Sequence, residues 1–418
     1  MQVVWLAPLC CSFALLAQDA PSKQAPDTKA PAAATPRRFN TLPVPEGQPL
    51  NLEPATRSAI DAMLRLQEGE GGDEWPYQGV YREDDNASPV GYRVGGTAIA
   101  CLGLLAAPDL PADFARQEAL QRGLAFVLKM LDAPRMNGEF IGRYDVRGWG
   151  HIYALELLLH LQERKLVPEP LAATVADKAG WLVKTLGDSA IPKSGGWNYS
   201  RPHGYLDPKN RASTFMTAPA LQALFHARAR GHAVDEKVVA QALDALERAR
   251  AKPGGYSYGA PPNSMAETDE EKLTMMDKTP SSAARAALCE TTLLLAGRGD
   301  QARLRAAVEL FFAHWDDLAV RKSQTGTHIP PYGIAPYYFL FGHVYCAQAI
   351  EHLDDVALRE SLREKMRAVL AKSREEDGSW NDRQFGRSGG YGTALALLTM
   401  YMPRWPMPEP WQPSAAKK

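Results

Sequence analysis

A glycine-rich turn that carries an aromatic residue recurs along this chain, in most cases ahead of a segment rich in Ala and Leu. The copies are Gly72-Asp73-Glu74-Trp75, Gly138-Glu139-Phe140, Gly195-Gly196-Trp197, Gly254-Gly255-Tyr256 and Gly378-Ser379-Trp380. Repetition at a long interval is typical of architectures in which each unit buries its apolar face against its neighbours. The interval of about 60 residues exceeds the roughly 34–47 of the common helical solenoids, which leaves room for long loops at one rim.

Two kinds of helix flank these turns. Before the fourth turn, Val239, Leu243 and Leu246 fall on one face, as expected of a helix that is half exposed. By contrast, Leu155 and residues 157–159 leave little polar face, which indicates a helix buried on most sides. One half-polar and one buried helix per repeat predict an outer layer around an inner layer.

Such helix pairs could stack as an open solenoid or close into a ring. Open solenoids need atypical capping repeats at their ends, whereas the first and last repeats of this chain are regular. We therefore predict an all-α fold, an (α/α)6 toroid made of six helical hairpins over residues 54–402.

The residues before and within the turns follow a further pattern. The residues concerned are Arg122, Gly123, Phe126, Val127 and 138–140 in one repeat, Lys178, Ala179, Trp181, Leu182 and 195–197 in the next, and Gln67, Gly72, Trp75 and 378–380 in two partial copies. This pattern resembles the repeat of the prenyltransferase and squalene-cyclase family over nearly the whole chain after residue 53. The resemblance implies an α/α toroid with a funnel-shaped central cavity.

The chain departs from this family at the motifs that carry its known chemistry. The Asp-x-Asp-Asp acid of the cyclases is missing, because Asp84-Asp85 lacks that spacing. The Asp-x-Cys pair of the zinc prenyltransferases is missing too, since Ile99, Ala287 and Val344 stand two residues before the cysteines of the mature chain. The Gly-Cys-Gly-Glu-Gln thioester and the Asp-Asp-x-x-Asp diphosphate motif are also absent. We therefore expect no cofactor, and whether the protein is an enzyme stays open.

The N-terminal segment predicts export. Residues 1–17 are typical of a secretory signal peptide, although no Lys or Arg precedes their apolar stretch. The stretch is shorter than the roughly 20 apolar residues that span a bilayer, so no transmembrane segment is expected in the mature chain. Cys10-Cys11 leaves a lipid anchor as the less favoured alternative. The expected location is secreted or periplasmic.

Composition restricts the remaining possibilities. The formal net charge of −1 gives no reason to expect a nucleic-acid partner. Residues 18–53 are rich in Pro and Ala and predict a disordered linker, because such a segment buries too little apolar area to fold. Residues 403–418 form a Pro/Trp-rich tail. The three cysteines of the mature chain, Cys101, Cys289 and Cys346, are widely separated in apolar segments and are expected to be buried thiols.

Three clusters of polar and aromatic residues are candidate sites, and the first is Trp149, His151 and Tyr153, where an inner helix is predicted to begin. A helix N-terminus attracts anions, and histidine suits acid–base chemistry near neutral pH. His151 is thus a candidate catalytic residue, with Trp149 and Tyr153 as ligand-binding residues. The structural alternative is that the rings pack the toroid while His151 bonds to a neighbouring turn.

The second cluster lies in the long loop before the third inner helix. His203, Tyr205 and Asp207 are candidate catalytic residues, and Trp197 and Arg201 are candidate binding residues. Aromatic rings stack on sugars, and an arginine holds a carboxylate through two hydrogen bonds. The alternative is a loop held by its own turn chemistry.

The third cluster lies in the least repeat-like segment and contains His328, Tyr332, Tyr337 and His343. We predict ligand-binding roles for them, because departure from a local rule often marks function. Their spacing does not place two histidines at i and i+4, so no metal site is expected from it.

Three hypotheses for function follow. The first is a secreted toroid that binds a small molecule, a glycan or a protein in its central cavity. The second is a carbohydrate-active lyase or hydrolase that uses a His/Tyr/Arg/Asp rim. The third is a terpenoid cyclase-like enzyme with a non-standard acid. A dry aromatic tunnel would favour an isoprenoid, an open groove with paired carboxylates would favour a sugar, and a plugged centre would favour a scaffold.

Overall fold

A computed structural model describes residues 50–79, 87–137, 146–199, 207, 210–251, 254–261 and 277–413. All of them belong to one compact unit of the chain. Arg201, His203 and Tyr205 of the second predicted cluster lie outside the described residues, as do residues 1–17 and most of the predicted linker. Among the described helices, none is both long and apolar enough to cross a membrane.

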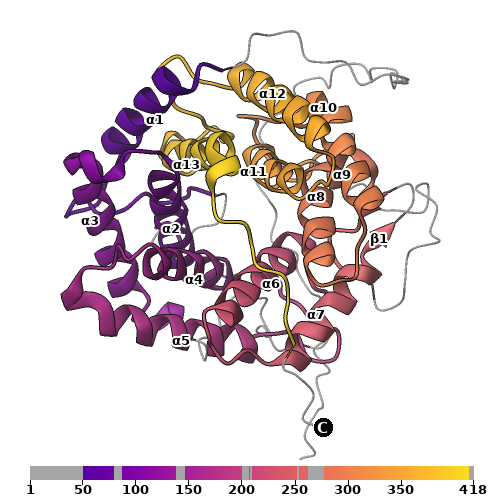
Figure 1. Ribbon diagram of the computed structural model, residues 1–418, viewed down its shortest axis with the longest axis horizontal. Coiled ribbons are helices and arrows are strands. Elements are labelled where there is room, and N and C mark those ends of the chain that lie inside the picture. Colours follow the sequence, from indigo (N-terminus) through magenta and orange to yellow (C-terminus); the bar gives the residue numbers. More distant parts are fainter. Residues whose placement is uncertain are drawn as a thin grey trace, which may run out of the picture. The chain divides into compact units, whose positions relative to one another are not determined.

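The described residues form two concentric layers of helices (Figure 1). The outer layer consists of α1 (Leu52–Leu66), α3 (Phe114–Met130), α5 (Ala172–Asp188), α7 (Glu236–Arg248), α9 (Gln301–Ala313) and α12 (Val356–Lys372). The inner layer consists of α2 (Val90–Ala106), α4 (Arg147–Glu163), α6 (Thr214–Ala229), α8 (Thr279–Leu295), α11 (Tyr338–Glu351) and α13 (Gly389–Tyr401). Each inner helix contacts the next, and α13 contacts α2, so the ring is closed. The predicted α/α toroid is confirmed.

Short elements complete the described part of the chain. They are α10 (Trp315–Ala319), the antiparallel strands β1 (Arg250–Ala251) and β2 (Gly255–Tyr256), and the 3-10 turns Leu110–Ala112, Pro134–Met136, Glu169–Leu171, Gly386–Ser388 and Met402–Arg404. The strand pair is the fourth glycine-aromatic turn, in which Arg250 pairs with Tyr256.

The Gly/Trp turns fasten the outer layer to the inner one. The Trp197 indole donates to the Leu186 carbonyl at the end of α5 (2.8 Å), and the Trp197 amide donates to the Thr217 hydroxyl of α6 (3.0 Å). Trp75 and Trp380 make the equivalent pairs of bonds in their own repeats. Gly196 precedes Trp197 at φ +73°, a left-handed conformation that favours glycine. The repeated motif thus sets the geometry of the hairpin.

Glycines let the inner helices approach each other closely. A Cβ placed on Gly103 of α2 would lie 2.5 Å from the Cα of Ala394 on α13, which is the contact that closes the ring. On the outer helix α5, a Cβ on Gly180 would meet no atom within 4 Å. The same substitution therefore has opposite consequences in the two layers.

We expect Gly103→Ala to lower the free energy of unfolding by about 2 kcal/mol, because the backbones of α2 and α13 must move apart. Gly180→Ala is the matched control, and it should raise stability by about 0.5–1 kcal/mol through helix propensity alone. Urea unfolding followed by circular dichroism measures both. Equal effects of the two substitutions would contradict this account of ring closure.

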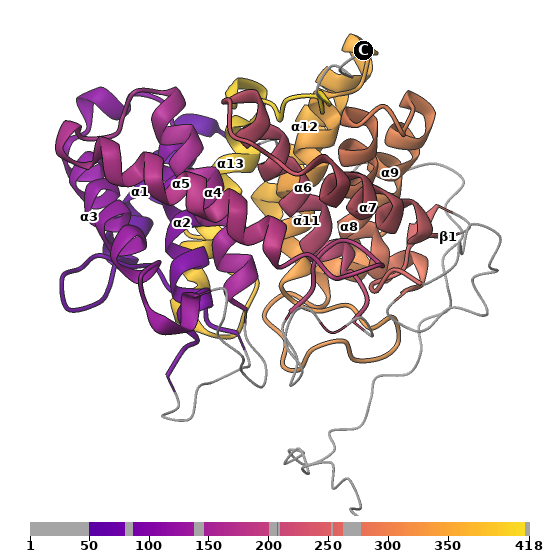
Figure 2. The ribbon, with the colours of Figure 1, turned by 90° about the horizontal axis from the view of Figure 1, so that it is seen from below.

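After α13 the chain crosses the end of the ring at which the inner helices terminate (Figures 1 and 2). The Trp405 ring lies 4.6 Å from the His160 ring in the last turn of α4. Further along, the Trp411 amide donates to the carbonyl of Leu295, the last residue of α8 (2.9 Å). This C-terminal segment, residues 405–413, therefore covers one mouth of the ring.

Candidate functional site

A cavity of about 90 Å³ lies beneath the C-terminal segment. One part of its wall is polar and is formed by Tyr153, Glu156, His160, Glu163, Gln222, His226, Arg230, Tyr345 and Gln348. Another part is aliphatic and is formed by Ile99, Leu102, Ile152, Val344, Leu395 and Leu398. Residues 405–409 contribute to the lining as well. The cavity is thus amphiphilic, and inner helices from around the ring contribute to it.

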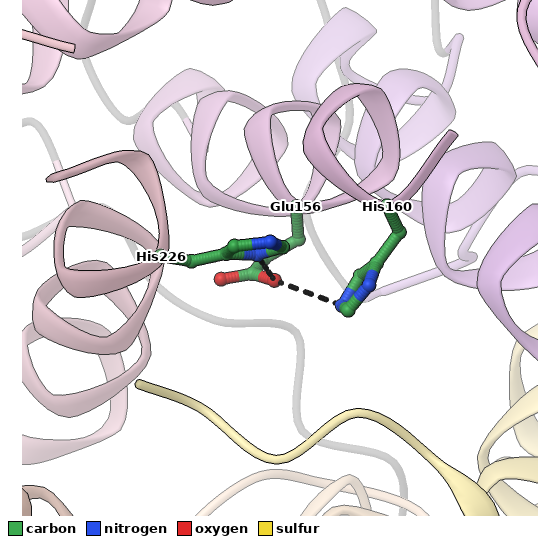
Figure 3. Close-up of side chains that lie close together, drawn as sticks. All are labelled: Glu156, His160 and His226. Atoms are coloured by element: carbon green, nitrogen blue, oxygen red, sulfur yellow. Dashed lines mark hydrogen bonds and ion pairs between the residues drawn. The ribbon is translucent and has the colours of Figure 1, made fainter. Parts of the chain in front are cut away.

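The polar wall contains a cluster of two carboxylates and two imidazoles, of which Figure 3 shows Glu156, His160 and His226. Glu156 Oε2 lies 3.3 Å from His226 Nδ1 and 3.4 Å from His160 Nε2. Glu163 Oε2 lies on the other side of both rings, 3.5 Å from His160 Nδ1 and 3.6 Å from His226 Nε2. Arg230 in turn pairs with the second oxygen of Glu163. We call Glu156, His160, Glu163 and His226 the His/Glu cluster.

The sequence places these groups by helical periodicity. Glu156, His160 and Glu163 stand at i, i+4 and i+7 on α4 and therefore share one face. His226 is on α6, which contacts α4 around the ring. Both histidine side chains are 7% exposed, so the cluster is largely removed from water. Buried charges are tolerated only when they are paired.

Mutual pairing determines the charge of the cluster. Burial alone raises the pKa of Glu156, but His160 and His226 outweigh it and bring that pKa down to about 2. The pKa of Glu163 is lowered to about 2, chiefly by His160, with burial opposing and Arg230 assisting. Burial lowers the pKa of His160, but the two glutamates outweigh it and raise the net value. Both carboxylates are therefore ionised near neutral pH.

The C-terminal segment holds one member of the cluster in place. The Trp405 ring packs against His160 at an interplanar angle of 56°, and the Arg164 guanidinium lies 4.5 Å from the centroid of the same indole. Figure 3 shows this segment passing the three side chains Glu156, His160 and His226. Chemically, the cluster offers carboxylate oxygens and imidazole nitrogens that can accept a cation or exchange a proton.

The residues of the first predicted cluster face two different places, the cavity and the outer layer of helices. Tyr153 lines the cavity, and its hydroxyl lies 3.1 Å from that of Tyr345. Trp149 packs with Tyr153 and belongs to a group of rings that also includes Tyr77, Tyr92 and Tyr391. His151 instead pairs with the Met136 carbonyl (2.9 Å) and contacts Trp181 of α5. Burial lowers the pKa of His151 to about 4.

The described members of the second and third clusters do not meet at one site. Trp197 is enclosed between α5 and α6, and Asp207 is half-buried in its loop. His328 bonds to the Gly333 carbonyl and to the Tyr337 hydroxyl, whereas Tyr332 is half-buried nearby. His343 is enclosed on α11, where it accepts from the Trp315 indole (2.9 Å).

Sequence reasoning did not single out the His/Glu cluster. A usable signal was present, because Glu156, His160 and Glu163 at i, i+4 and i+7 place three ionisable groups on one face of a helix that is mostly apolar. Such residues need buried partners, which points to a shared site. The contribution of His226 could not be read in the same way, because it depends on how α4 and α6 are positioned around the ring.

A further buried acid precedes the last inner helix. Asp382, between the third Trp turn and α13, is fully buried, and both of its carboxylate oxygens lack a hydrogen-bond partner among the described residues. Burial raises its pKa to about 7 despite the nearby Arg383 guanidinium. A negative charge on Asp382 in turn contributes to raising the pKa of Tyr77 and of Tyr391. Asp382 is therefore a carboxylic acid that holds its proton close to neutral pH.

No family model matches this sequence, and neither does any curated protein. Solved structures do resemble the fold. An unsaturated glucuronyl hydrolase from Bacillus sp. GL1 aligns with a TM-score of 0.51 and 14% identity, over 83% of this chain and 95% of the other. An inactive variant of an alpha-1,6-mannanase from Salegentibacter sp. HEL1_6 aligns with a TM-score of 0.50 and 11% identity, over 84% and 98%. A type II terpene cyclase from Scytonema aligns with a TM-score of 0.48 and 14% identity, over 84% and 97%. At these identities the likeness to the two glycan-acting enzymes shows the α/α toroid fold alone.

Proposed function

We propose that the toroid binds a small molecule in the cavity beneath its C-terminal segment, with a polar head at the His/Glu cluster and an aliphatic body against the opposite wall. The observation that carries this proposal is the amphiphilic lining of a partly open pocket between the inner helices and the C-terminal segment. Ligand sites are typically apolar concavities with a few convergent polar groups. The closed ring offers such a space without requiring movement of the inner helices.

The cavity volume limits the ligand. A cavity of about 150 Å³ accommodates benzene with its six non-hydrogen atoms, so 90 Å³ suits a body of about four non-hydrogen atoms. Isobutyrate, isobutylamine and isobutanol share a branched body of this size and differ in the charge of the head. They are therefore suitable probes.

We expect at least one of the three probes to raise the melting temperature of the protein by about 2–4 °C at ten times its dissociation constant, which corresponds to about 1.4 kcal/mol of stabilisation. Leu398→Phe, on the aliphatic wall, should abolish the shift because the added ring fills the space. Val356→Phe is the control, since Val356 is exposed on the outer helix α12. If no probe shifts wild type, or if Leu398→Phe responds as wild type does, the proposal is wrong.

The His/Glu cluster does not favour a glycoside hydrolase. Such an enzyme needs one carboxyl group that keeps its proton to protonate the leaving oxygen. Both Glu156 and Glu163 have lowered pKa values, so neither can serve as that acid near neutral pH.

We also propose that the protein is exported, on the basis of the apolar stretch in residues 1–17. N-terminal sequencing of the protein recovered from its native host should begin shortly after Ala17. A mature chain that begins at Met1 would contradict export by this signal.

A further inference from the structure

The His/Glu cluster has the donor set and spacing of a transition-metal site. We infer that Glu156, His160 and His226 bind a divalent first-row transition metal ion such as Zn²⁺, with Glu163 orienting both histidines. One ligand atom from each of the three residues lies within 4.8 Å of the other two. This inference departs from the sequence analysis, which expected no metal.

The distances match what a bound ion requires. An ion with tetrahedral bonds of about 2.1 Å spaces its ligand atoms about 3.4 Å apart. Glu156 Oε2 lies 3.3 Å from His226 Nδ1 and 3.4 Å from His160 Nε2. Two of the three edges of the ligand triangle therefore have the required length. Two imidazoles and one carboxylate are a donor set that suits zinc and its neighbours rather than Mg²⁺ or Ca²⁺, which prefer oxygen donors.

The positions of the remaining ring nitrogens support the same assignment. Metal-binding histidines usually direct the other ring N–H toward a carboxylate, which fixes the tautomer and the ring orientation. Glu163 Oε2 lies 3.5 Å from His160 Nδ1 and 3.6 Å from His226 Nε2, the nitrogens that face away from Glu156. One carboxylate oxygen therefore lies within ion-pair distance of both rings, although it makes no hydrogen bond to either among the described residues, and Arg230 pairs with the other oxygen of the same carboxylate.

The supporting structure is rigid, and the site is open on one side. Two ligands come from one face of α4 and the third from α6, so neighbouring inner helices hold all of them. Three protein ligands leave a fourth position, as in metal sites that bind a ligand or substrate. All three line the amphiphilic cavity, so an exogenous head group can reach that position. The inference thus deepens the proposed function, because it predicts that a bound ion favours an anionic head such as that of isobutyrate.

The direct test is Zn²⁺ titration of the purified full chain after removal of metals with a chelator, with a chromophoric competitor to report affinity. We expect one Zn²⁺ per chain, and no competition from excess Mg²⁺ or Ca²⁺. His226→Gln and Glu156→Gln should each weaken binding by about 100-fold or more, since altering a supporting residue alone costs about 10- to 100-fold. Glu163→Gln, which leaves all three ligands in place, should weaken it by about 10- to 100-fold.

His232→Gln is the matched control, because this half-buried histidine follows α6 but lies outside the cluster. It should bind Zn²⁺ as wild type does, and circular dichroism verifies that each variant is folded. Wild type loaded with Co²⁺ provides a readout that needs no variant, since a four-coordinate site gives strong visible absorption and an octahedral one does not. Absence of one-to-one binding, or undiminished binding by both His226→Gln and Glu156→Gln, would show that the cluster is an ion-pair network without a metal. Weak absorption by bound Co²⁺ would contradict the four-coordinate geometry.

The metal inference and the proposed function can fail separately. Leu398→Phe fills the aliphatic side and leaves every donor atom in place, so it should remove the response to the isobutyl probes and keep the affinity for Zn²⁺. Zinc binding without any probe response would refute the proposed function alone. Probe binding without zinc would refute the metal site alone.

Discussion

Trp197→Ala is expected to lower the free energy of unfolding by about 3–5 kcal/mol, the usual cost of removing a large aromatic side chain from a core. Trp197 is 1% exposed, and its indole donates to the Leu186 carbonyl at the end of α5. The truncation therefore leaves a cavity and removes the indole hydrogen bond, while the Ser189 hydroxyl still donates to the same carbonyl (3.3 Å). Urea or thermal unfolding followed by circular dichroism measures the loss. A single cooperative transition is expected, because the closed ring couples every hairpin to two neighbours.

The control for this substitution is Phe114→Ala, which removes an aromatic ring that is 77% exposed at the start of α3. Its effect should stay within about 0.5 kcal/mol. The pair also tests the sequence-based hypothesis that Trp197 binds a ligand. Wild-type stability for Trp197→Ala, together with lost ligand binding, would support that hypothesis and contradict the structural role described here.

Asp382→Asn is expected to stabilise the protein increasingly as the pH rises. The pKa of Asp382 is raised by burial from 3.8 to about 7, so the folded state binds this proton more tightly than the unfolded state does. Wild type therefore loses stability as the pH rises from about 4 to 7, and the loss is constant above that range. Each pKa unit is worth about 1.4 kcal/mol, which gives a total of about 4 kcal/mol.

The informative quantity is the difference in unfolding free energy between Asp382→Asn and wild type from pH 5 to pH 8. It should grow by about 3 kcal/mol, because about two pKa units of the shift fall within that range. Asp354→Asn, at an exposed position after α11, should show no such growth. A flat difference for Asp382→Asn would mean that the buried carboxylate is ionised in the folded protein.

The architecture could be read from the chain because its cause is local and repeated. Each Gly/Trp turn repeats the same backbone requirement, and each second helix carries too little polar surface to face water. Trp75, Trp197 and Trp380 stand in corresponding places in their turns, and the structure gives each the same two hydrogen bonds. The repeat in the sequence therefore corresponds to a repeated hairpin in the structure.

Individual site residues could be predicted less well. Tyr153 was predicted as a ligand-binding residue and lines the cavity. His151 precedes it by two residues, which is a rotation of about 200° around α4, and faces Trp181 of the outer layer. Both residues sit in the same stretch, so the polar pattern did not separate them. The side of a nearly all-apolar helix that faces the cavity depends on how the helix is rotated about its own axis relative to its neighbours.

The sequence by itself determined the repeat, the two helix layers and the closure of the ring, because these depend on short-range turn chemistry and on the apolar surface that each hairpin must bury. Only the tertiary structure decided that His226 of α6 meets Glu156 and His160 of α4, and that Trp405 covers the cluster. It also decided that the Asp382 carboxylate is enclosed without a hydrogen-bond partner among the described residues. These encounters join residues up to 245 positions apart (Trp405 and His160, 405 − 160). Their geometry is set by helix rotation and packing around a closed circle, which no local pattern in the chain encodes.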